Sequence, residues 1–185
     1  MYKFINNLID KLLKLPKAVV FIVLAASFIY ANIFGSIPLL SSVITTLISM
    51  TGIKYIWVNA IIFGLLAWGL FELIAAVYFW IVKSMMGATE IYKNKPAMTD
   101  ILRWFFIIRN IIFGSVRLLY FRYPLAVLTV ENILLFALSL ATLIIYYFVI
   151  RKKYIAPQLY PRSVMAFCAP YLVYLVVNMF TGVLL

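Results

Sequence analysis

The chain has 185 residues, of which 67% are hydrophobic and only 11% are charged, and its mean hydropathy is +1.12. Soluble domains carry about 25% charged residues, so this chain has too few polar side chains to cover a globule in water. The net charge of +11 indicates basic cytoplasmic loops and anionic lipid headgroups rather than nucleic acid, because no basic cluster lies on a plausible soluble module.

The predicted fold class is all-α: a polytopic, integral membrane helical bundle. In lipid every backbone N–H and C=O must be paired internally, which leaves helices or a closed barrel. The apolar runs are long and unbroken rather than alternating, and this pattern favours helices. The single cysteine, Cys168, excludes a disulfide within one chain.

Residues 1–17 are predicted to form an amphipathic helix at the membrane interface. Apolar pairs alternate with polar pairs at helical spacing, and Pro16 ends the pattern. The apolar stripe consists of Phe4, Ile5, Leu8, Ile9, Leu12 and Leu13. An apolar face flanked by lysines suits the membrane interface, although a helix packed on a partner's surface has the same pattern.

Residues 18–185 are predicted to form a single transmembrane helical bundle with about five spans. The spans are expected at about 18–34, 57–82, 103–123, 126–150 and 163–185. The apolar stretch 37–53 is short for a span of about 20 residues, so we expect a re-entrant or interfacial helix there. A polar loop is expected at 84–100, where Thr99 or Asp100 caps the next helix, and Pro170 is expected to kink the last span.

Basic residues predict the topology. With the N-terminus in the cytoplasm and the C-terminus outside, the outer side keeps little beyond Lys54 and Arg122. The cytoplasmic side then holds Lys3, Lys11, Lys14, Lys17, Lys83, Lys93, Lys95, Arg103, Arg151, Lys152, Lys153 and Arg162. The expected location is therefore a plasma or inner membrane, with a cytoplasmic N-terminus.

The residues needed for catalysis are scarce. The chain has no histidine, which is the usual base and metal ligand near neutral pH. Its five acidic residues, Asp10, Glu72, Glu90, Asp100 and Glu131, are scattered, and no metalloprotease, nucleophile-elbow or phosphate-binding motif occurs. We therefore expect no catalytic, cofactor-binding or metal-binding residues, no cofactor and no enzymatic activity.

Charges within the predicted spans are the remaining candidates for a functional site. Glu72 lies near the middle of 57–82, where a bare carboxylate is costly. Its helical depth falls between those of Arg109 and Arg117, so either is a candidate partner and Arg109 is preferred. Glu131, near the outer start of the fourth span, is level with Arg117 and Arg122. Arg103, Asn110 and Arg117 repeat every seven residues and share one helix face, whereas Arg109 points elsewhere.

This candidate network of Glu72, Arg109, Arg117 and Glu131 has two interpretations. It forms a polar pathway for an ion, a lipid headgroup or an anionic substrate, or it is structural: paired charges that fix helix register, or arginines that snorkel to lipid headgroups. The structural interpretation is favoured, because a conduction path needs more lining groups than these. An arginine paired with an acidic residue of another subunit is a third possibility.

Small and aromatic residues have structural interpretations. Gly64, Ala67 and Gly69 permit another helix to approach the 57–82 span closely. Trp57, Trp80 and Trp104 lie at span ends, where tryptophans anchor helices at the interface.

The layout of the chain resembles Yip1-type membrane proteins. The resemblance rests on Leu15-Pro16-Lys17 before the first span, Met86-Gly87 after the second, and three further spans with a basic break before the last. It implies a role in trafficking or in assembly of other membrane machinery, and it implies no site residues.

The expected function is a non-enzymatic accessory or structural subunit that assembles with or stabilises a larger membrane protein complex. Its expected partners are the lipid bilayer and other membrane protein subunits, without nucleic acid. A small transporter or channel component that uses Glu72 with Arg109 or Arg117 is the alternative, and a lipid-modifying enzyme is the third hypothesis.

Overall fold

The computed structural model describes residues 7, 9–32, 56–86, 89–120 and 127–181. These residues are almost entirely helical and include no strand, which confirms the all-α prediction. The elements in chain order are α2 (Lys17–Asn32), α4 (Ile56–Met86), α5 (Thr89–Tyr120), α6 (Val127–Tyr154), the 3₁₀-helix η1 (Pro157–Leu159) and α7 (Tyr160–Thr181). The stretch 37–53, predicted to be re-entrant or interfacial, lies outside the described residues.

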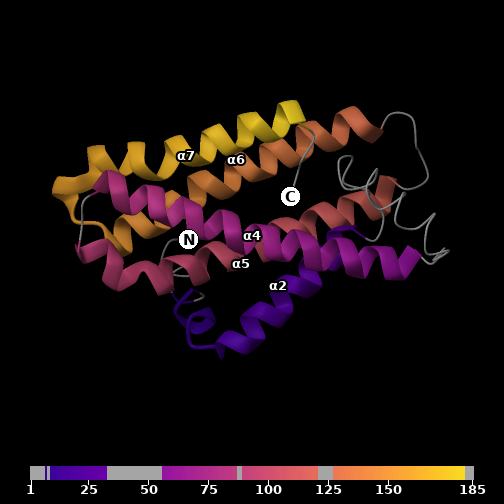
Figure 1. The fold of residues 1–185 in the computed structure, drawn as a ribbon, viewed down its shortest axis with the longest axis horizontal. Helices are drawn as coiled ribbons and strands as arrows, with labels where there is room; N and C mark the ends of the chain where they lie inside the picture. The colour runs from indigo at the N-terminus through magenta and orange to yellow at the C-terminus, as the bar shows by residue number, and fades with distance from the viewer. Residues whose placement is uncertain (1–6, 8, 33–55, 87–88, 121–126, 182–185) are drawn as a thin grey trace.

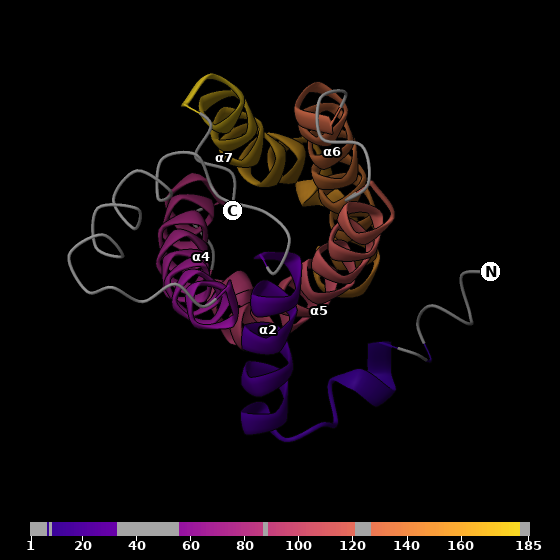
Figure 2. The same ribbon diagram turned by 90° about the vertical axis from the view of Figure 1, so that its right-hand side faces the viewer.

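Helices α4, α5, α6 and α7 run along the length of the described structure, and α2 lies obliquely across α4 and α5 (Figure 1). Seen from the end, α4, α5, α6 and α7 follow one another around a ring (Figure 2). Helix α5 packs on α6, α6 on α7, and α7 on α4, whereas α4 and α5 contact each other less extensively. Helix α2 packs against both of them, so it covers the seam between α4 and α5.

The predicted loop at 84–100 is wrong. Helix α4 continues to Met86, and α5 begins at Thr89 and runs through Pro96. Pro96 removes one backbone donor and disfavours a helix, but Met98, two residues further, is fully buried and holds this part of α5 in the core. Tertiary packing has therefore overridden local preference.

The predicted helix cap is wrong for the same reason. Thr99 and Asp100 lie inside α5 instead of at its start. The Thr99 hydroxyl donates to the carbonyl oxygen of Lys95 at 2.8 Å, one helical turn back. Asp100 accepts a hydrogen bond from Arg103. The apolar segments predicted at 18–34, 57–82, 126–150 and 163–185 agree with helices α2, α4, α6 and α7 to within a few residues at each described end.

Aromatic side chains fill the core where α2, α4 and α5 meet. The ring centroids of Phe71 and Phe106 are 4.5 Å apart, and Phe28 lies 5.8 Å from Phe71. On the other side of the bundle, the buried Tyr146 hydroxyl donates to the carbonyl oxygen of Met98 at 3.2 Å. Tyr78 donates to the carbonyl oxygen of Phe167 at 2.9 Å and so joins α4 to α7.

Two glycines allow α2 to lie close to its neighbours. A Cβ atom on Gly64 of α4 would stand 2.7 Å from the Cα of Ile29, and one on Gly114 of α5 would stand 2.6 Å from the ring of Tyr30. The prediction that Gly64 permits close approach is confirmed. Gly69 has nothing within 4 Å of such an atom, so that part of the prediction is wrong.

The N-terminal segment, described at residues 7 and 9–15, packs on the outside of α5 and α6. It is helical up to Leu12, and its last turn closes before Pro16, as predicted. Ile9 is only 7% exposed and belongs to the main core cluster. Asp10 forms an ion pair with Lys153 at the end of α6. The described part of the apolar stripe, which consists of Ile9, Leu12 and Leu13, thus lies against the chain's own α5 and α6, a surface that neither the interfacial nor the partner interpretation includes.

Two described segments are long and apolar enough to cross a membrane. They are Gly64–Met86 and Ile133–Tyr154, with mean hydropathies of 2.0 and 2.6. The apolar segment Lys17–Ala31 is shorter. Two such helices suggest a membrane protein weakly.

Candidate functional site: a charged node between three helices

Arg103 on α5 binds two carboxylates at once. Its Nε donates to Oε1 of Glu72 at 2.9 Å, and its Nη2 donates to Oε2 of the same carboxylate at 2.7 Å. Its Nη1 donates to Oδ1 of Asp100 at 2.6 Å. Glu72 lies on α4 and Asp100 lies three residues before Arg103 on α5. We call these three residues the Arg103 node.

The bidentate contact is the strong form of an arginine–carboxylate pair. Two parallel N–H···O bonds fix the orientation of both groups and are stronger than bonds between neutral partners. The side chain of Arg103 is 12% exposed and that of Glu72 is 25% exposed, so screening by solvent is limited. The node therefore joins α4 to α5 through a bidentate ion pair.

Helix α2 completes the surroundings of the node. The guanidinium carbon of Arg103 lies 4.4 Å from the centre of the Phe21 ring, a cation–π distance. Phe21 in turn packs edge-on against Trp68 of α4, with centroids 6.2 Å apart. One arginine thus contacts side chains on all three helices, α2, α4 and α5.

The structure assigns Glu72 a different partner from the one predicted. Both of its oxygens bind Arg103, whereas the depth argument preferred Arg109. Arg109 is 3% exposed, and its guanidinium carbon lies 4.8 Å from the ring centre of Phe106. Arg117 lies on α5 and Glu131 on α6, but their side chains are outside the described part of the structure, so a contact between them remains a prediction.

Sequence reasoning missed Arg103 and Asp100 as site residues. The topology prediction assigns Arg103 to the cytoplasmic charges, and the helix prediction makes Asp100 a possible helix cap. A signal was present: Asp100 and Arg103 are three residues apart, the spacing at which opposite charges meet on one helix face. It went unused because residues 84–100 were interpreted as a loop.

The shared face predicted for Arg103 and Asn110 is confirmed. Arg103 contacts Phe21 of α2, and the side-chain amide of Asn110 donates to the Ser27 hydroxyl of the same helix at 3.2 Å. Both Asn110 and Ser27 are buried. One turn further, the hydroxyls of Tyr30 and Ser115 lie 3.1 Å apart. Polar contacts therefore follow the α2–α5 seam from the node outwards.

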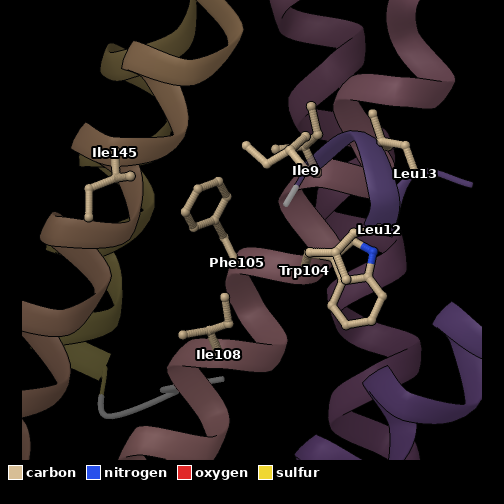
Figure 3. Close-up of a pocket in the computed structure, with 8 residues that line it drawn as sticks. Ile9, Leu12, Leu13, Trp104, Phe105, Ile108 and Ile145 are labelled. Carbon is tan, nitrogen blue, oxygen red and sulfur yellow. The ribbon is translucent and has the colours of Figure 1, made fainter. Parts of the chain in front are cut away.

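Apolar hollows lie elsewhere on the bundle. One of about 180 Å³ lies between the N-terminal segment, α5 and α6. Figure 3 shows side chains of all three elements around it. Its lining consists of Ile9, Leu12, Leu13, Ile101, Trp104, Phe105, Ile108 and Ile145. Trp104, predicted as a membrane-interface anchor, is part of this wall, and Trp80 is 68% exposed on α4.

A second apolar groove, of about 340 Å³, lies between α4 and α7, with Leu102 and Phe106 of α5 also in its lining. Pro170 contributes to its wall. The Arg103 node lines neither hollow. Among the described residues no three His, Cys, Asp or Glu side chains are placed to hold a metal ion.

No protein-family model matches the chain, and no match was found among curated proteins or solved structures. The resemblance to Yip1-type proteins therefore rests on the layout of the chain alone.

Proposed function

We propose that this chain is an integral membrane protein with about five spans that acts, without catalysis of its own, as a structural or accessory subunit of a larger membrane protein complex. The observation that carries the proposal is the bidentate pairing of Glu72 with Arg103. Glu72 is the one acidic residue of the apolar segment of α4. Because both its oxygens bind within the bundle, its charge stabilises helix packing instead of lining an open path.

The exposed surface of the apolar helices supports the membrane part of the proposal. Only 33% of the most apolar window of α4 and 44% of that of α6 are buried within the chain. The core helix of a soluble protein would be mostly buried. Large apolar side chains such as Leu73, Trp80 and Phe148 are instead more than half exposed, and a surface of this kind needs lipid or another protein against it.

The proposed topology is tested by labelling cysteines in intact cells. Basic residues favour a cytoplasmic N-terminus, so a cysteine at Ser84, exposed near the end of α4, should be shielded from an impermeant thiol reagent. One at Ser41 should be labelled. Cys168 is first replaced with alanine to remove background, and permeabilised cells serve as the control for reactivity. Labelling with the opposite pattern would overturn the topology.

The subunit role is tested by photo-crosslinking from α4 and α6. A photoreactive amino acid at Trp80 or Phe148 should form a covalent adduct with a second membrane polypeptide that also co-purifies in mild detergent at fixed stoichiometry. Phe79 is the matched control, because it is next to Trp80 but only 3% exposed, and it should react within the chain. Adducts with lipid alone at both exposed positions would contradict the proposal.

A transport role makes the opposite prediction for Glu72. If the chain itself moved an ion, Glu72→Gln would leave assembly and stability normal and abolish ion movement in vesicles. The subunit role predicts a loss of stability or of complex yield in the same variant.

A further inference from the structure

The hollow beneath the N-terminal segment is apolar, as the structure describes its lining. Its volume is about 180 Å³, and every described side chain around it is hydrophobic. An apolar cavity of about 150 Å³ stays dry and accepts apolar ligands, because water would lose its hydrogen bonds there. The chemistry of the wall thus calls for a hydrocarbon group.

The rim of this hollow is strongly basic. The ion pair between Asp10 and Lys153 brings the N-terminal segment against the end of α6. Lys11 and Lys14, which are chain neighbours of the lining residues Leu12 and Leu13, are both exposed. Asp10 is engaged by Lys153, so Lys11 and Lys14 give this rim a net positive charge.

We propose that the hollow and its rim together bind an anionic phospholipid. One acyl chain lies between Leu12, Phe105 and Ile145, and the phosphate lies among Lys11, Lys14 and Lys153. The proposal rests on the membrane location proposed above. It adds a ligand class and assigns the N-terminal segment a role, namely the wall that closes the lipid site.

Charge complementarity selects the anionic lipid over a neutral one. Lys11 and Lys14 are exposed on the outer side of the segment, and long basic side chains reach headgroups while their stems cover apolar surface. Each basic residue near an anionic membrane surface favours binding about fivefold. The apolar wall would accept any acyl chain, so the headgroup preference must come from the rim.

The test uses the full-length chain, purified and delipidated in mild detergent, with lipid binding measured by native mass spectrometry. Phosphatidylglycerol should bind at one site about tenfold more tightly than phosphatidylcholine with the same acyl chains. Equal binding of the two lipids would overturn the proposal. So would displacement of phosphatidylglycerol by soluble glycerol phosphate, because the acyl chain would then contribute nothing.

A matched pair of substitutions on α6 locates the acyl chain. Ile145 lines the hollow and Ile144 does not, and each is 46% exposed. Ile145→Trp should fill the hollow and weaken phosphatidylglycerol binding about tenfold, because overpacking excludes the chain. Ile144→Trp should bind as the unsubstituted chain does. Equal binding by the two variants would place the lipid elsewhere and overturn the proposal.

The double substitution Lys11→Gln and Lys14→Gln tests the rim separately. It should remove the preference for phosphatidylglycerol while leaving phosphatidylcholine binding unchanged, since the apolar wall is intact. A preference that survives the double substitution would refute the assigned rim. Trp80 on α4 does not line the hollow, so crosslinking from Trp80 tests the subunit role alone. The lipid-binding measurements test the lipid site alone, and the two proposals can therefore fail separately.

Discussion

Replacing Arg103 with methionine is expected to lower the free energy of unfolding by about 3–5 kcal/mol, because it leaves two carboxylates without their cation in a largely buried site. Glu72→Gln should cost less, about 1–3 kcal/mol, since Arg103 keeps Asp100 as a partner. Unfolding of the purified chain in mixed micelles, by titration with a denaturing detergent, measures both values.

The double variant separates pairing from general damage. Adding Glu72→Gln to Arg103→Met removes one of the stranded carboxylates, so the combined loss should fall short of the sum by about 1–3 kcal/mol. Arg109→Met is the control, because Glu72 binds Arg103 with both oxygens, and its effect should add to that of Glu72→Gln. If the effect of Glu72→Gln were instead non-additive with Arg109→Met and additive with Arg103→Met, the Arg103 node would be refuted. The prediction from helical depth that Glu72 pairs with Arg109 would then hold.

The prediction that Glu72 pairs with Arg109 was wrong for an identifiable reason. A carboxylate in an apolar helix does need a partner, and Arg103 is that partner. Depth along the third span is counted from its predicted start at about residue 103, whereas α5 begins at Thr89. Arg103 then lies more than three turns inside a helix instead of at its end, where it can meet Glu72 across the α4–α5 hairpin.

The helices themselves were largely predictable because their apolar runs are long. The seven-residue spacing of Arg103 and Asn110 correctly predicts that both share one face of α5, and in the structure that face meets α2. The start of α5 was unpredictable from local signals, since polar residues around Pro96 are equally typical of a loop. The burial of Met98 against other helices favours a helix over a loop around Pro96. The local sequence does not encode that contact.

The N-terminal segment shows a similar limit. Its amphipathic pattern was clear, and Pro16 ended it as predicted. An apolar stripe, however, specifies only that it needs an apolar surface, without specifying which one. The chain's own α5 and α6 provide that surface, and the ion pair of Asp10 with Lys153 joins residues 143 positions apart. No periodicity in the sequence links them.

Gly64→Ala is expected to destabilise the bundle although alanine is the better helix former. The added Cβ atom would meet Cγ1 of Ile29 and would stand 2.7 Å from the backbone N and Cα of the same residue. Side-chain rotation cannot relieve a clash with backbone, so α2 must move away from α4. Overpacking of this kind costs about 1–3 kcal/mol, and a displaced α2 also strains the Asn110–Ser27 hydrogen bond.

Two other glycines turn this into a graded series. A Cβ on Gly114 meets chiefly the Tyr30 ring at 2.6 Å, which can rotate at the expense of the Tyr30–Ser115 contact, so Gly114→Ala should cost less than Gly64→Ala. Gly69→Ala meets nothing within 4 Å and should stabilise the helix by up to about 1 kcal/mol. The same detergent titration gives all three values. If Gly64→Ala were as stable as Gly69→Ala, α2 would not lie against α4 at Ile29, and the seam that brings Phe21 over Arg103 would have to be redrawn.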